Sequence, residues 1–186
     1  FNRPHRVPSL SHSHPKYKAN GRYWVGGVWP GTNYMIISGL VDKGFRQLAW
    51  DITMNHYNNV LEVYKKTGTF FEYYAPESNH PGFMARKDFV GWTGLPPIAE
   101  LIEYIFGIRA NHEQNAITLD VNLLDAYGID KYPYGQDGLI SFKVQKRNSK
   151  EEKPKVTIQT NVPFKVILLW SDKKIEQQVG VGKHSL

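Results

Sequence analysis

The spacing of apolar residues changes once along this chain, near residue 112, and this change restricts the possible folds most strongly. Before it, apolar residues recur every three or four positions, as on the buried face of an α-helix. After it, they alternate in short runs separated by polar turns, as in β-strands. We therefore predict an α+β chain in which a helical part, residues 1–112, precedes a small antiparallel β part, residues 113–186.

The pattern between residues 32 and 106 predicts three helices. The first two are separated only by Gly44, and so short a link favours an antiparallel pair. The second ends before Thr67-Gly68, and Pro96-Pro97 opens the third because proline suits the first turn of a helix. The strands predicted after them are Ala116–Asn122, Leu139–Gln145, Lys155–Thr160, Phe164–Trp170 and Lys174–Val181.

Three segments rich in glycine and aromatic residues flank these helices, at residues 22–30, 69–78 and 88–94. Trp24 and Trp29 offer flat faces for stacking, and glycine lets the backbone approach a ligand closely. If the helices alternate in direction, the three segments converge at one mouth. This convergence favours a carbohydrate cleft, and the alternative is a packed, tryptophan-rich corner.

Two carboxylates lie in the second of these segments. Glu72 stands among four aromatic residues, where partial desolvation suits a carboxylate to act as an acid or a base. The alternative is a surface glutamate that only hydrogen-bonds its own loop. Glu77, after Pro76, is more typical of an acceptor that braces the loop.

Several classes of function are excluded. The net charge of +6 comes from scattered residues, and the densest group, at 147–155, is interrupted by two glutamates, so we predict no nucleic-acid partner. No apolar run approaches the ~20 residues of a membrane span, and there is no cysteine. His5, His12 and His14 lack the spacing of an established metal site, so no metal or other cofactor is predicted.

Three motifs carry a resemblance to a known family. They are Tyr23-Trp24-Val25-Gly26-Gly27-Val28-Trp29-Pro30 with Thr32-Asn33-Tyr34, then Thr67-Gly68-Thr69 leading to Glu72-Tyr73-Tyr74-Ala75-Pro76-Glu77, then Gly91-Trp92-Thr93-Gly94. Together they resemble the trehalase and processing α-glucosidase I group of (α/α)6-barrel hydrolases. Within that group they are most similar to bacterial proteins related to glycoside hydrolase family 63 and to mannosylglycerate-hydrolase-like proteins. The resemblance spans roughly residues 1–170.

The resemblance implies hydrolysis of α-linked glucosides or related sugars with inversion, by two carboxylates. Glu72 matches the general base of the group. Val25 is a departure, because some relatives carry arginine there. The residues implied to bind substrate are Tyr23, Trp24, Trp29, Asn33, Tyr74, Glu77 and Trp92.

The same resemblance implies a fragment. The group's barrel has six helix pairs, this chain offers three or four helices, and the aspartate general acid of an upstream motif has no counterpart here. We therefore expect a partial (α/α)6 toroid that is completed by the remaining N-terminal barrel segment or by another copy, and that binds an oligosaccharide or a small glycoside. The alternative is a carbohydrate-binding or scaffold module without turnover.

Overall fold

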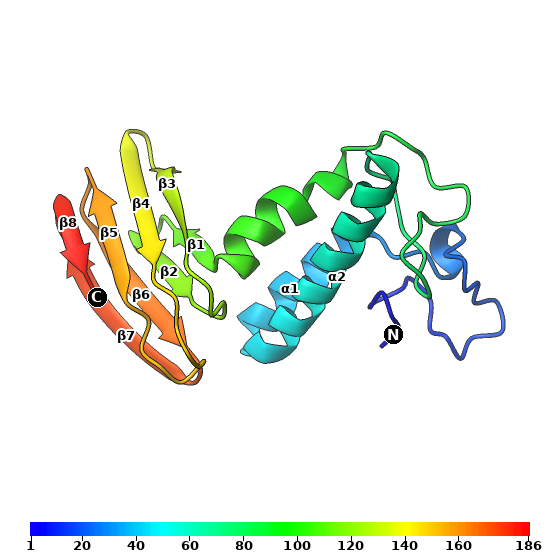
Figure 1. Cartoon of the computed structure of the whole chain (residues 1–186), viewed down its shortest axis with the longest axis horizontal. Helices are drawn as coiled ribbons and strands as arrows, with labels where there is room; N and C mark the ends of the chain where they lie inside the picture. Colours follow the sequence, from blue (N-terminus) through cyan, green and yellow to red (C-terminus); the bar gives the residue numbers. More distant parts are fainter. The chain divides into compact units, whose positions relative to one another are not determined.

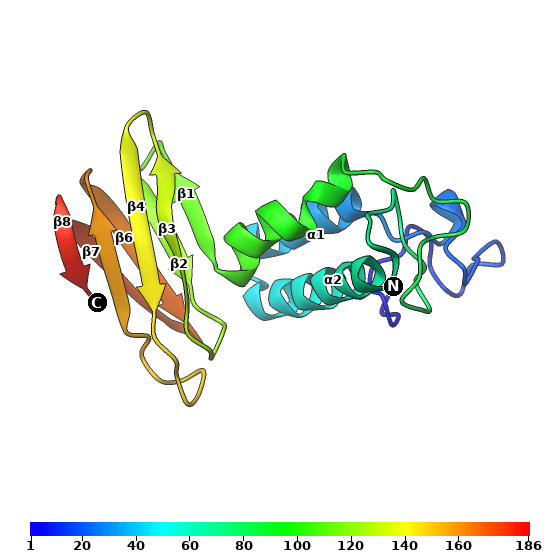
Figure 2. The same cartoon turned by 45° about the horizontal axis from the view of Figure 1, so that its top comes forward.

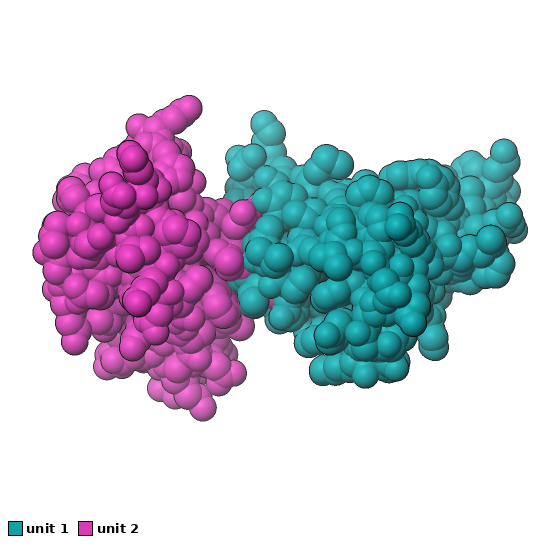
Figure 3. Space-filling model, turned by 90° about the horizontal axis from the view of Figure 1, so that it is seen from above, with its two compact units in different colours: residues 1–101 teal, residues 102–186 magenta.

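The computed structural model describes residues 1–186, which form two compact units. Unit 1 comprises Phe1–Leu101 and unit 2 comprises Ile102–Leu186, coloured separately in Figure 3. Unit 1 contains two long helices and extended loops, and unit 2 contains all eight strands (Figure 1). The predicted α+β class and the order of its two parts are confirmed.

Unit 1 is built on two adjacent helices, α1 (Pro30–Asp42) and α2 (Arg46–Thr67) (Figure 1). Helix α1 begins two residues before the predicted Thr32, since Pro30 occupies the first turn, where a missing N–H costs nothing. Gly68, in the left-handed region at φ 73°, ends α2 by donating to the carbonyl of Tyr64 at 2.7 Å. None of the helices combines the length and the hydrophobicity that a membrane crossing requires.

The chain has three further helical segments, all shorter than α1 and α2. The turns η1 (Tyr23–Val25) and η2 (Trp92–Gly94) are 3₁₀-helical, and η3 (Pro96–Ile105) is π-helical. The third predicted helix therefore exists from Pro96 but is wound more widely than an α-helix.

The interior of unit 1 is small. Val60 and Val63 of α2 pack with Val28, Phe71 and Tyr74 in one buried cluster. Other apolar side chains on or beside the helices stay exposed, among them Met35, Phe45, Leu48 and Ile98. A groove of about 480 Å³ is lined by apolar residues that include Phe1, Val7, Trp24, Ile36, Leu48 and Ile52. The apolar helix faces are thus partly uncovered.

Unit 2 consists of two four-stranded sheets, ordered β1-β2-β6-β7 and β3-β4-β5-β8. The two sheets lie one over the other (Figures 1 and 2). Buried side chains from both sheets form one hydrophobic cluster. In β6 alternate residues are buried, as expected for a strand with one face on a core. The strands are β1 (Ile108–Asn111), β2 (Ala116–Asp120), β3 (Tyr127–Tyr134), β4 (Gly138–Val144), β5 (Val156–Thr160), β6 (Phe164–Trp170), β7 (Lys173–Val179) and β8 (Gly182–Ser185).

One pairing corrects the expectation of an entirely antiparallel β part. Strands β2 and β6 are parallel, with Ala116 opposite Lys165 and Asp120 opposite Leu169, whereas all other pairs are antiparallel. The chain between them forms β3, β4 and β5 in the other sheet, and so long a crossover can return a strand in the same direction.

Candidate functional site

The three segments rich in glycine and aromatic residues lie together in unit 1. Val28 and Tyr74 exchange two backbone hydrogen bonds of 2.9 Å, which join the first segment to the second. The indole Nε1 of Trp92 donates to the carbonyl of Glu72 at 2.7 Å, which joins the third segment to the second. The predicted convergence of these segments is confirmed.

Aromatic rings form a continuous stack at this junction. The ring of Trp24 lies on Trp29 with centroids 4.2 Å apart and planes at 12°, and Trp29 lies on Tyr73 at 4.5 Å and 29°. Tyr23 meets Trp29 edge-on at 5.1 Å. Trp29 is only 4% exposed, but Trp24 is 49% exposed and Tyr23 54%. The stack therefore has a fixed centre and an accessible outer end.

An apolar cavity of about 170 Å³ opens beside the stack and is lined by Trp24, Trp29, Gly31, Thr32, Met35 and Trp92. A Cβ on Gly31 would lie 3.5 Å from the Cβ of Trp92, so the helix start and the third segment are in close contact. Flat aromatic walls of this kind suit the apolar face of a sugar ring.

Glu72 has a fixed backbone and a free carboxylate. Its N–H donates to the carbonyl of Arg86 at 3.0 Å, and its own carbonyl accepts the bond from Trp92. The half-buried side-chain carboxylate makes no hydrogen bond or ion pair within the chain. Burial, and then the nearby charge of Glu72, raise the pKa of Tyr73 above its ordinary value, which places this charge beside the aromatic stack. The carboxylate is available to a ligand or to water.

Glu77 is engaged within the chain. Arg3 donates to both of its carboxylate oxygens at 2.6 Å, and the hydroxyl of Tyr17 donates to one of them at 2.6 Å. The hydrogen bonds from Arg3 hold the pKa of Glu77 below its ordinary value. This geometry fits the loop-bracing alternative for Glu77 and leaves little of its carboxylate for a substrate.

Two of the residues implied to bind substrate are buried. The amide of Asn33 donates to the carbonyls of Val7 and Trp29 at 3.4 and 3.2 Å, and the hydroxyl of Tyr74 accepts the N–H of Phe71 at 3.3 Å. Both residues are 0% exposed. Their burial leaves no side-chain surface for a ligand in this structure, and the Nδ2 of Asn33 and the hydroxyl of Tyr74 bond the backbone around them, although Oδ1 of Asn33 has no partner.

Sequence analysis missed Met35 as part of the cavity. Met35 lies four residues after Gly31 on α1, so both face the same side of the helix, and that spacing was a usable signal. It also missed the partner of His5. That side chain is buried against His56 of α2, whereas the ring of His12 meets Tyr17 edge-on.

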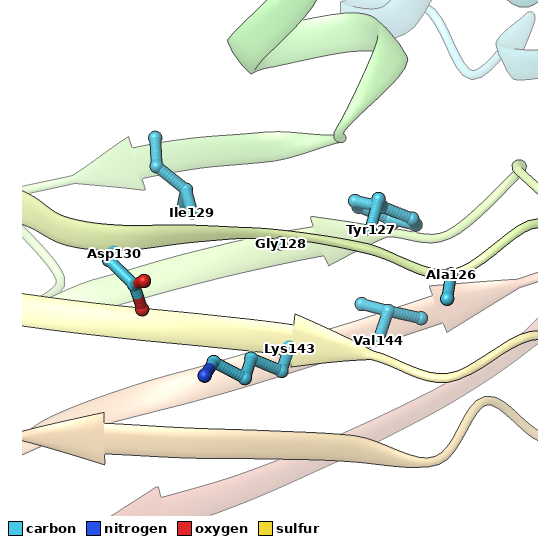
Figure 4. Close-up of a pocket in the computed structure, with 7 residues that line it drawn as sticks. All are labelled: Ala126, Tyr127, Gly128, Ile129, Asp130, Lys143 and Val144. Atoms are coloured by element: carbon cyan, nitrogen blue, oxygen red, sulfur yellow. The ribbon is translucent and has the colours of Figure 1, made fainter.

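Unit 2 has an open pocket of about 410 Å³ on strands β3 and β4. Figure 4 shows Asp130 and Lys143 on neighbouring strands beside the backbone of Gly128. The pocket has no stack of exposed aromatic rings and only one carboxylate, so it lacks the features that distinguish the site in unit 1.

Comparison with known proteins gives a family match over the residues that form the candidate site. Residues 1–93 match the model of the mannosylglycerate hydrolase MGH1-like glycoside hydrolase domain, and these residues include the stack and Glu72. The chain therefore belongs to this family of glycoside hydrolases. This membership confirms the resemblance inferred from the three motifs. No solved structure matches the chain.

Curated relatives share part of the chain. It is 31% identical to the probable mannosyl-oligosaccharide glucosidase of Schizosaccharomyces pombe over 102 residues, which are 50% of this chain and 12% of that protein. It is 33% identical to mannosylglycerate hydrolase MGH1 of Selaginella moellendorffii over 97 residues, 52% of this chain and 18% of that protein. It is 34% identical to alpha-glucosidase 2 of Arabidopsis thaliana over 82 residues, 39% of this chain and 10% of that protein. The matched part is thus less than a fifth of each of these relatives.

Proposed function

We propose that this chain carries the general base and part of the sugar-binding surface of an inverting α-glycoside hydrolase. The observation that supports the proposal most directly is the free carboxylate of Glu72, held by two backbone hydrogen bonds beside exposed aromatic rings. A base needs this combination, because its position must be fixed while its oxygens stay open to water.

In this proposal Glu72 removes a proton from the water that attacks the anomeric carbon, on the face opposite the leaving group. An inverting enzyme needs a second carboxyl group, roughly 6.5–9.5 Å away, to protonate the departing oxygen. The other carboxylates of this loop region are engaged: Glu77 binds Arg3, and Asp88 accepts the hydroxyl of Thr69 at 2.7 Å. We therefore assign the acid to a segment of the enzyme outside the present residues.

The aromatic stack is the proposed sugar platform. Trp24 and Trp92, 49% and 40% exposed, line the cavity from two different segments. Stacking of this kind holds the ground state and the transition state alike, so it lowers KM more than it raises kcat. Alpha-glucosides are the substrate class that we propose, consistent with the names of two of the relatives.

The exposed helix faces fit the same proposal. Several apolar side chains of α1, α2 and the N-terminal residues line one continuous groove. Continuous apolar surface of this kind, unlike single exposed side chains, is typical of a site that contacts another segment or protein. We propose that the rest of the helical barrel, or another copy of the chain, covers it. A carbohydrate-binding module without turnover is the second candidate function, and it is favoured by the single free carboxylate at the site.

The test is Glu72→Gln in the full-length enzyme, with Glu62→Gln on the outer face of α2 as the control. Glutamine keeps the shape of the side chain but cannot accept the proton, so kcat for α-glucosides should fall ~10²–10⁴-fold with KM little changed. Glu62→Gln should keep full activity. Full activity in Glu72→Gln would refute the role of Glu72 as base.

A second measurement separates the two candidate functions. The 186-residue chain should not hydrolyse α-glucosides, while the full-length enzyme should release the anomer of inverted configuration, as followed by NMR of the fresh product. Robust hydrolysis by the 186-residue chain would refute the assignment of the acid to another segment. Absence of hydrolysis by the full-length protein would favour the binding module.

A further inference from the structure

Residues 3–9, here called the strap, connect helix α2 with the site. On the helix side, the carbonyl of Pro4 accepts the amides of Asn55 and Asn59 at 2.8 and 3.3 Å. The backbone N–H of Arg6 donates to the side-chain oxygen of Asn55 at 2.8 Å. The strap is therefore fastened to one face of α2 by side-chain amides.

On its other side the strap is bonded to two of the site's segments. The N–H of His5 donates to the carbonyl of Pro76 at 2.9 Å, and that of Ser9 donates to Gly27 at 2.9 Å. The ion pair between Arg3 and Glu77 adds a third link. Apart from the bond between Ser9 and Gly27, these contacts join residues about 50 to 75 positions apart in the sequence, which folding must bring together at a cost in chain entropy.

A buried pair of histidines joins the centre of the strap to α2. His5 Nε2 and His56 Nδ1 are 2.7 Å apart, and the two residues are 1% and 0% exposed. The ring centroid of Tyr74 lies 5.8 Å from that of His5. In a neutral pair, one of the two bonded ring nitrogens donates and the other accepts. The pair thus extends from α2 to the segment that holds Glu72.

We propose that the His5–His56 pair is a positioning device that fixes the segment carrying Glu72, an inference that rests on the proposed function. Pro76, whose carbonyl accepts the N–H of His5, lies four residues after Glu72, and Tyr74, whose ring lies beside that of His5, is hydrogen-bonded to both Val28 and Phe71. Movement of His5 therefore displaces the backbone from which the base projects. A base displaced by about 1 Å can lose ~10²-fold in rate.

The pair requires neutral imidazoles. Burial lowers the pKa of His56 to about 3, and burial followed by the charge of His56 lowers the pKa of His5 well below its ordinary value. The titratable groups that face the pair are the two rings themselves and the phenol of Tyr74, so no carboxylate is present to stabilise an imidazolium. Protonation should loosen the strap, and the contact should therefore persist at neutral pH and fail in acid.

The experiment uses the 186-residue chain and NMR, with the indole N–H of Trp92 and the backbone amides of Glu72 and Tyr74 as reporters. His56→Leu fills the space but removes the hydrogen bond, so amide exchange at Glu72 and Tyr74 should accelerate at least ~10-fold, and the Trp92 indole resonance should shift. The single variants His5→Gln and His56→Asn keep a nitrogen near the bonded position, so amide exchange at Glu72 and Tyr74 should stay slow in each of them. In the unmutated chain, exchange at the same amides, corrected for its intrinsic dependence on pH, should accelerate in acid.

The outcomes that overturn the proposal are specific. Unchanged exchange and an unchanged Trp92 resonance in folded His56→Leu would refute it, as would a His56→Asn variant that behaves like His56→Leu. If His56→Leu does not fold, Asn55→Ala can replace it, because it releases the strap from the surface of α2. The same amides and the same indole are then followed, and the same changes are expected. Because turnover is not measured, failure here leaves the role of Glu72 as base standing. Failure of the Glu72→Gln test leaves the strap's structural effect standing.

Discussion

The two units differ in how completely they bury their apolar side chains. Unit 2, with fewer residues, has one cluster of 15 buried hydrophobic residues between its sheets. Unit 1 is longer, but its cluster has only five. Most of the large exposed hydrophobic side chains, including Trp24, Met35 and Trp92, belong to unit 1.

The units also differ in their buried titratable groups. In unit 2, Asp120 is paired with Arg109 at 3.2 Å. In unit 1, both oxygens of the buried Glu100, Nε2 of His56 and Oδ1 of Asn33 have no hydrogen-bond partner. In unit 2 the unpaired buried atoms are Nε of Arg147 and Nε1 of Trp170, and neither belongs to a carboxylate or an imidazole. Unit 1 thus combines open apolar faces with an unpaired carboxyl group, whereas unit 2 has a closed core, and features of the first kind are common in functional regions.

The largest effect on stability should come from the core of unit 2. Phe142→Ala removes a ring that is 1% exposed, between two sheets, and should lower the free energy of unfolding of unit 2 by ~3–5 kcal/mol. Leu139→Ala, on the same strand but 46% exposed, should cost less than ~1 kcal/mol. Hydrogen exchange resolved by segment measures both. Equal costs would contradict a closed core in unit 2.

The next effect concerns the pH dependence of unit 1. Burial lowers the pKa of His56 from 6.5 to about 3, so the unfolded chain takes up a proton first and stability falls as pH falls below 6.5. His5 acts in the same direction. Burial raises the pKa of Glu100 from 4.5 to about 8, so the unfolded chain loses its proton first and stability falls as pH rises from 4.5 to 8. Between pH 4.5 and 6.5 the effect of the two histidines exceeds that of the one glutamate, and above pH 6.5 only the glutamate acts. The free energy of unfolding of unit 1 should therefore be largest near pH 6.5.

Glu100→Gln isolates the alkaline side of this profile. In the unmutated chain the free energy of unfolding of unit 1 should fall by ~1–2 kcal/mol between pH 6.5 and 8, because one group contributes up to ~1.4 kcal/mol per pH unit. The variant should be flat over that interval. Denaturant titrations at several pH values measure the difference, and an equally steep decline in the variant would show that another group is responsible.

The smallest effect on stability should come from the outer end of the stack. Trp24→Ala removes a half-exposed ring and should change the free energy of unfolding by at most ~1 kcal/mol, yet it should weaken binding of α-glucosides several-fold. Phe83→Ala is the matched control, since Phe83 is 46% exposed in the same unit but does not line the cavity. Equal affinity in both variants would contradict the role of Trp24 as a platform.

Much of the fold was predictable because it depends on local pattern. Strand β6 has the predicted limits, Phe164–Trp170, since its apolar residues and the break at Pro163 are both visible in the sequence. Strand β3 was missed because it is an edge strand with a register shift, a proline and Lys131 at φ 56°. The parallel pairing of β2 with β6 depends on contacts about 50 residues apart, which no local pattern encodes.

The candidate site was predictable in its composition and less so in its geometry. The sequence indicates that aromatic residues and Glu72 belong to converging loops, but not which side chains face inward. Asn33 and Tyr74 resemble ligand-binding residues by type, yet both are buried, because the loops need internal hydrogen bonds where they meet. The pairing of His5 with His56 could not be foreseen, since nothing local relates the two positions.

The most direct test of the central claim locates the sugar on the chain. Methyl α-glucoside at about 10–100 mM, a range that detects weak affinities, is titrated into the 186-residue chain while proton–nitrogen NMR follows the indoles. We predict that the resonances of Trp24 and Trp92 move, while those of Trp170 in the core of unit 2 and of the amides of Gly128 and Asp130 in its pocket do not. Movement confined to unit 2, or none at Trp24 and Trp92, would contradict it.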